Sequence, residues 1–131
     1  MTESDDRLVV TVDFDGIIVK QAFPDVGETN HFVVQCLKKI RGNGAYLILN
    51  TCRWGDHLDA ALDRCSSLGL EFDAVNENLD HMILKWGECR KLGGHLYIDD
   101  RDICHSPARL KLRLWMLANF YRTMCKRYNG R

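Results

Sequence analysis

Several features that would mark common classes of protein are missing from this sequence. The six cysteines form no Cys-x-x-Cys pair, and no histidine lies at zinc-ligand spacing from two cysteines, so a structural zinc site is not expected. There is no long apolar run, and the acidic, polar N-terminus is unlike a signal peptide. We therefore expect a cytoplasmic protein without a membrane span. Its cysteines, Cys52 included, are expected to be reduced and to act as small buried apolar side chains.

A net charge of either sign is also missing, so no field of the whole protein directs it toward nucleic acid or membranes. The charge is nevertheless unevenly placed. Seven of the 18 basic residues, and none of the 18 acidic residues, lie between residues 106 and 131. A length of 131 residues with 46% hydrophobic content fits one folded domain, spanning residues 1–131, with a core of its own.

Strand-like and helix-like segments alternate along the chain. Short apolar runs predict strands at residues 8–14, 45–50, 72–75 and 95–98. Apolar residues at helical spacing predict helices at residues 30–40, 56–68 and 79–92, and a long helix from Pro107 to about residue 127. This alternation predicts an α/β fold, a three-layer sandwich around a mostly parallel, Rossmann-like sheet.

Paired carboxylates follow the first and the last of these expected strands. Asp13 and Asp15 stand at the end of the first strand, in the sequence Asp-Phe-Asp-Gly, and Asp99 and Asp100 follow the last one. The carboxyl ends of parallel strands meet at one edge of a sheet, which is where ligands bind. Four carboxylates at such an edge would repel one another unless a cation lay among them. Oxygen ligands of this kind suit Mg²⁺.

The order of these motifs resembles that of the haloacid dehalogenase (HAD) superfamily of phosphohydrolases. The matching residues, all between residues 8 and 101, are Asp13, Asp15 and Gly16 for the first motif, Thr51 for the second, Lys91 for the third, and Asp99 and Asp100 for the fourth. With Arg53 and Arg101, the set is similar to a subgroup of small bacterial or phage HAD-like hydrolases. The resemblance implies a HAD-like fold without a cap domain, because residues 17–29 and 76–90 are too few to form one.

The resemblance also implies a Mg²⁺-dependent phosphatase with an aspartyl-phosphate intermediate. Asp13 would be the nucleophile, and Asp15 would act as general acid and base. Thr51 and a lysine would hold the transferring phosphoryl oxygens. That lysine is Lys91, with Lys85 as a rival. The metal would be held by Asp13, Asp15, Asp99 and Asp100.

Two parts of the sequence leave alternatives open. Arg53 and Arg101 would either bind a substrate phosphate or pair with the acidic residues. The C-terminal helix is apolar over much of its circumference, so we expect it to be buried on more than one side, against the sheet and against a second subunit or the active-site mouth. The alternative function is a non-catalytic HAD-like module that binds a phosphorylated or nucleic-acid partner through this basic helix. Neither the identity nor the size of a substrate follows from the sequence.

Overall fold

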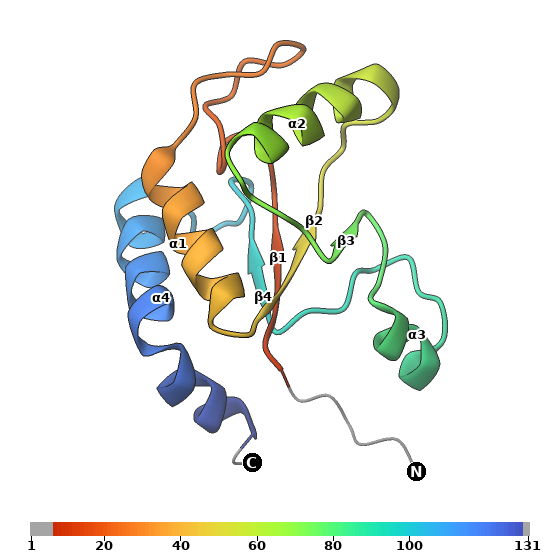
Figure 1. The fold of residues 1–131 in the computed structure, drawn as a ribbon, viewed down its shortest axis with the longest axis vertical. Coiled ribbons are helices and arrows are strands. Elements are labelled where there is room, and N and C mark those ends of the chain that lie inside the picture. Colours follow the sequence, from red (N-terminus) through yellow and green to blue (C-terminus); the bar gives the residue numbers. More distant parts are fainter. Residues whose placement is uncertain (1–6, 130–131) are drawn as a thin grey trace.

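The computed structural model describes residues 7–129, with side chains described through residue 120. Strands and helices alternate in the order β1 (Val9–Val12), α1 (His31–Gly42), β2 (Tyr46–Leu49), α2 (Gly55–Ser67), β3 (Ala74–Val75), α3 (Asp80–Trp86), β4 (Leu96–Ile98) and α4 (Pro107–Asn129). The strands form one sheet in the order β3-β2-β1-β4, and every pairing is parallel (Figure 1). The predicted α/β fold with a parallel sheet is confirmed.

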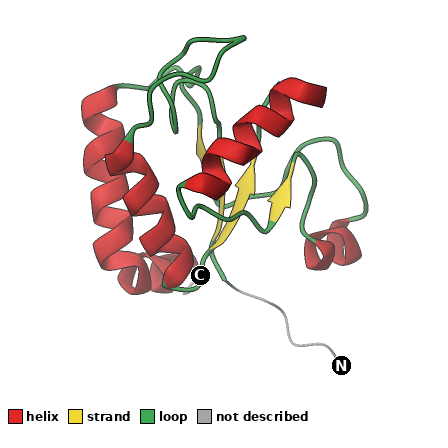
Figure 2. Cartoon of the chain, turned by 45° about the horizontal axis from the view of Figure 1, so that its top comes forward, coloured by secondary structure: helices red, strands yellow, loops and turns green. Residues whose placement is uncertain are grey.

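Two apolar clusters lie on the two faces of the sheet and hold its layers together. The larger cluster joins one face of β1 and β2 to buried residues of α1, α2 and α4. The smaller cluster joins the other face, at Val9 and Ile48, to Met82 of α3 and to Leu92. Figure 2 shows the helices on either side of the strands. Burial on both faces explains why β1 and β2 are nearly continuous apolar runs.

Helix α1 shows how the sequence specifies a helix and its packing. The side chain of Asn30 accepts a hydrogen bond from the amide of Val33 at 3.2 Å, which caps the first turn. The buried side chains then recur on one face, at Val33, Val34, Cys36, Leu37 and Ile40. This face sets α1 on the sheet, directly after the loop that follows β1.

Two sequence predictions need correction. The helix expected at residues 79–92 ends at Trp86, because Gly87 takes a left-handed backbone conformation (φ +79°) and the chain leaves the helix there. The cysteines do not behave alike. Cys36 and Cys65 are buried, as expected, but Cys52, Cys89 and Cys104 are exposed. The expectation that Cys52 fills a buried gap is therefore wrong.

Helix α4 is buried on only one side along residues 107–120. Leu114, Leu117 and Ala118 are buried in the larger cluster, and α4 lies beside α1 (Figure 1). The apolar side chains left exposed on this stretch are Leu112, Trp115, Met116 and Phe120. A second subunit on that side stays a prediction, and the side chains of the last basic residues, from Arg122 onward, lie outside the described part. No helix among residues 7–129 is both long and apolar enough to cross a membrane.

Candidate functional site

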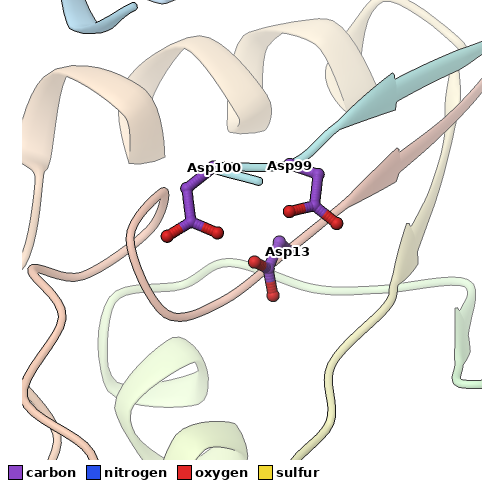
Figure 3. A group of neighbouring side chains, drawn as sticks. All are labelled: Asp13, Asp99 and Asp100. Atoms are coloured by element: carbon purple, nitrogen blue, oxygen red, sulfur yellow. The ribbon is translucent and has the colours of Figure 1, made fainter. Parts of the chain in front are cut away.

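Three carboxylates meet at the sheet edge where β1 and β4 end. Asp13 follows β1 directly, and Asp99 and Asp100 follow β4. One oxygen from each carboxylate lies within 4.8 Å of an oxygen of each of the others, and all three residues are half-buried. Figure 3 shows the side chains turned toward one another. The two strand ends are aligned by a hydrogen bond from the amide of Asp13 to the carbonyl of Ile98 at 2.8 Å.

The surroundings of Asp13 change its pKa. Burial, a side-chain hydrogen bond with Asp100 and the negative charge of Asp99 together raise the pKa of Asp13 from 3.8 to about 7. The amide of Phe14 donates a hydrogen bond to Asp13 Oδ1 at 2.8 Å, which favours the ionised form and lowers the pKa by a smaller amount. Without a cation, Asp13 therefore keeps its proton between about pH 4 and about pH 7, where an isolated aspartate would lose it.

Gly16 makes room for this arrangement. The chain turns sharply after Asp15, and Gly16 has φ +86°, a conformation that side chains disfavour. A Cβ atom at Gly16 would also collide with the carboxylate of Asp100. The glycine of the Asp-Phe-Asp-Gly motif thus lets the loop after β1 pass directly beside the loop after β4.

Asp15 does not join the three carboxylates but pairs with Arg53. The guanidinium donates from Nε to Asp15 Oδ2 and from Nη2 to Asp15 Oδ1, both at 2.8 Å. The Arg53 side chain is 1% exposed and that of Asp15 is 14% exposed. Arg53 was expected either to bind a substrate phosphate or to pair with the acidic residues, and in the structure it pairs with Asp15. As a result, both carboxylate oxygens of Asp15 are already engaged.

Arg53 also fastens the long loop between β1 and α1. Its guanidinium donates to the backbone carbonyls of Pro24, Asp25 and His57 at 2.7 to 3.3 Å. The rings of Phe14 and Phe23 lie 5.3 and 5.1 Å from its charged carbon. One buried cation thus connects the end of β1, the loop and the start of α2. Sequence reasoning missed this role, because the carbonyls that Arg53 contacts leave no signature in the sequence.

Thr51 lies at the same sheet edge, two residues after β2. Its hydroxyl oxygen accepts a hydrogen bond from the amide of Arg53 at 3.1 Å. The amide of Thr51 donates in turn to the side chain of Asn76 at 2.8 Å, and Asn76 directly follows β3. Asn76 is a second supporting residue that sequence reasoning missed. A polar residue after a third parallel strand was the available signal.

The structure does not bring the expected lysine to the site. Lys91 precedes β4, whereas the carboxylates follow it, and neighbouring Leu92 packs with Val9 near the start of β1. The ammonium of Lys91 lies 5.7 Å from the centre of the Tyr97 ring. The rival Lys85 lies against Trp86 on α3. Among the described residues, no lysine or arginine forms an ion pair with Asp13, Asp99 or Asp100.

The basic residue nearest in sequence to the acidic group is Arg101. Its backbone amide donates to Asp99 Oδ1 at 2.9 Å, and its side chain is exposed. The three carboxylates offer oxygen donors, which are the ligands that a hard divalent cation such as Mg²⁺ prefers, and water would fill its other positions. The pKa of Asp13 is raised first by burial, then by the hydrogen bond with Asp100 and the charge of Asp99, and a bound cation would counter all three by favouring the ionised carboxylate.

Replacing Arg53 by methionine should destabilise the protein far more than removing an exposed ion pair. Arg53→Met removes a buried guanidinium and leaves the half-buried Asp15 carboxylate and three carbonyls without their donor, at a cost of about 3–5 kcal/mol in the free energy of unfolding. Arg41 is the matched control, because it pairs with Asp73 and Glu71 but is 36% exposed. Arg41→Met should cost about 1 kcal/mol or less. Urea unfolding measures both, and equal losses would contradict the anchoring role of Arg53.

Asp13 should make stability depend on pH when no metal is present. The pKa of Asp13 is about 7 in the folded state and 3.8 in the unfolded state, so the folded state holds its proton more tightly. The resulting contribution to the free energy of unfolding is complete below pH 3.8 and is lost as the pH rises through 7. Asp13→Asn has no such loss, and its advantage over the wild type should grow between about pH 4 and about pH 7. Urea unfolding with a chelator measures this, and the exposed Asp59→Asn on α2 is the control. Parallel pH profiles for wild type and Asp13→Asn would refute the assignment.

Comparison with known proteins gives one informative relative. No protein-family model and no curated protein matches this sequence. A solved structure of a conserved protein from Bacteroides thetaiotaomicron is 34% identical and superposes with a TM-score of 0.75. The alignment covers 88% of this chain and 92% of that one, and the relative's description names no activity. At this identity and coverage, the chain belongs to the same family as the conserved Bacteroides thetaiotaomicron protein.

Proposed function

We propose that this protein is a Mg²⁺-dependent phosphohydrolase in which Asp13 accepts the phosphoryl group. The observation that supports this most is the meeting of Asp13, Asp99 and Asp100 at the carboxyl edge of a parallel sheet. Phosphoryl transfer depends on positioning and on neutralising negative charge, and a divalent cation beside a nucleophilic carboxylate serves both needs. The resemblance of the ordered motifs to the HAD superfamily supports the same chemistry.

In this proposal, Asp13 attacks phosphorus through one carboxylate oxygen while the bond from phosphorus to the leaving oxygen breaks, and water then hydrolyses the aspartyl-phosphate. Its Oδ1 atom accepts the hydrogen bond from the Phe14 amide, which fixes the orientation of the carboxylate. Asp99 and Asp100 would hold the metal together with Asp13. When bound, Mg²⁺ supplies positive charge that ionises Asp13 and offsets the charge of the phosphoryl oxygens.

In this proposal, Thr51 would donate a hydrogen bond to a phosphoryl oxygen. Its hydroxyl oxygen already accepts the Arg53 amide, so the single hydroxyl proton is free to point into the site. Lys91, which precedes β4, has no role at the phosphoryl oxygens in this mechanism. The exposed side chain of Arg101 is the remaining candidate for a cation at the phosphate, since its backbone is already bonded to Asp99.

The ion pair with Arg53 limits what Asp15 does. Both oxygens of Asp15 accept hydrogen bonds from Arg53, so at least one must be released before Asp15 can carry a proton to a leaving group. Protonation of the leaving oxygen is therefore expected to be the weaker part of the mechanism. A substrate with a stable leaving group, such as an aryl phosphate, needs that proton least.

Substitution of the two carboxylates should separate their roles. Asp13→Asn should abolish turnover of phenyl phosphate, because the amide is not a nucleophile. Asp15→Asn should reduce turnover of an alkyl phosphate more than that of phenyl phosphate, because the alkyl leaving group has the greater need of a proton. Initial rates with Mg²⁺ measure both effects. Turnover by Asp13→Asn at the wild-type rate would overturn the mechanism and favour the non-catalytic alternative.

Mg²⁺ should stabilise the folded protein through the acidic group. Binding to the folded state alone adds about 2.7 kcal/mol to the free energy of unfolding when Mg²⁺ is at a hundredfold excess over its Kd. Asp99→Asn should remove most of this gain. Asp102→Asn is the matched control, because Asp102 lies in the same loop but outside the three-carboxylate group. Thermal unfolding with and without Mg²⁺ decides, and a wild-type melting temperature indifferent to millimolar Mg²⁺ would count against a metal site.

A further inference from the structure

A cavity opens beside the acidic group, between the free edge of β4 and helix α4. It has a volume of about 380 Å³. Its walls are the length of β4, the loop that includes Asp102 and His105, and one face of α4. Asp99 belongs both to this lining and to the three-carboxylate group. The cavity therefore borders the acidic group at Asp99 and extends along the sheet edge.

The lining of the cavity combines an apolar wall with two cations. Leu110, Leu114 and Leu117 of α4 face Leu96 and Ile98 of β4 and make the wall apolar. Arg109 and Arg113 also line the cavity, one helical turn apart on α4, and both are exposed. Among the described residues, neither guanidinium forms an ion pair. Two guanidinium groups at this spacing suit a carboxylate or a phosphate, which they bind in a bidentate manner.

We propose that this cavity receives the body of the substrate, a small phosphate monoester that carries an apolar portion and a second anionic group. The inference rests on the proposed function, since it places the ester phosphate at Asp13. The volume lies within the range of small-molecule sites, which is about 300–1,000 Å³. The apolar wall would hold the carbon skeleton, and Arg109 and Arg113 would bind the second anion. This role accounts for the two arginines, Arg109 and Arg113, on the part of α4 that lines the cavity together with Asp99.

Asp102 fixes where the second anion lies. Its carboxylate also lines the cavity and accepts a hydrogen bond from the amide of Cys104 at 2.8 Å. Because this negative charge repels an anion, the second anionic group is placed on the α4 side of the cavity. A neutral body of the same size would gain only the apolar contacts.

Two non-hydrolysable phosphonates test the proposal without depending on turnover. Calorimetric titration of the full chain with Mg²⁺ compares benzylphosphonate with 4-carboxybenzylphosphonate, which differ by one carboxylate. The wild type should bind the carboxylated compound at least about tenfold more tightly. The double variant Arg109→Gln and Arg113→Gln should bind both compounds with the affinity that the wild type has for benzylphosphonate. Arg90→Gln, an exposed arginine outside the cavity, is the control and should keep the wild-type preference.

The outcomes separate this inference from the proposed function. Equal affinity of the wild type for the two phosphonates, or a preference that survives in the double variant, overturns the inference even if phenyl phosphate is hydrolysed. If neither phosphonate binds to the wild type, the inference is overturned as well. If the preference depends on Arg109 and Arg113 but no phosphate ester is hydrolysed, the anion-binding cavity stands and the phosphohydrolase proposal falls.

Discussion

Mutual repulsion among Asp13, Asp99 and Asp100 is the constraint around which this end of the molecule is organised. Parallel strands deliver the three carboxylates to the same edge, and neither a lysine nor an arginine among the described residues pairs with them. Burial, a side-chain hydrogen bond with Asp100 and this repulsion, in that order, raise the pKa of Asp13. Gly16 and the amide of Phe14 hold the carboxylates close together in spite of it. A site that gathers negative charge in this way is suited to a divalent cation, and a phosphate would bind through that cation.

The nearby cation of Arg53 does not pair with these three carboxylates but with Asp15. It is buried under the loop between β1 and α1, where it holds Asp15 and three backbone carbonyls. Two acidic residues only two positions apart thus have different partners. Asp13 lies with the carboxylates of β4, and Asp15 lies with a guanidinium. This division makes Asp13 the reactive carboxylate in our proposal and makes Asp15 first of all a structural one.

The sequence predicted the features that depend on local pattern. Strands β1, β2 and β4 and helices α1, α2 and α4 lie where the apolar spacing placed them, and the acid pairs at two strand ends predicted the position of the acidic group. It did not predict features that depend on which groups meet in space. The distance of Lys91 from the site follows from the direction of β4, and the role of Arg53 follows from the course of a loop. Cys52 is exposed, although the sequence predicted that it is buried, because the chain has left the sheet by that point.

In our proposal, the cavity along β4 provides selectivity for the part of the substrate that the acidic group does not contact. The proposed function depends on whether the three carboxylates are a metal-dependent phosphoryl site. The most direct test is a crystal structure of the protein grown with Mg²⁺ and beryllium trifluoride, a mimic of a phosphoryl group bound to a carboxylate. The account predicts the mimic on a carboxylate oxygen of Asp13, with Mg²⁺ beside it and in contact with Asp99. A structure with the mimic absent from Asp13, or with Mg²⁺ bound away from these three carboxylates, would contradict it.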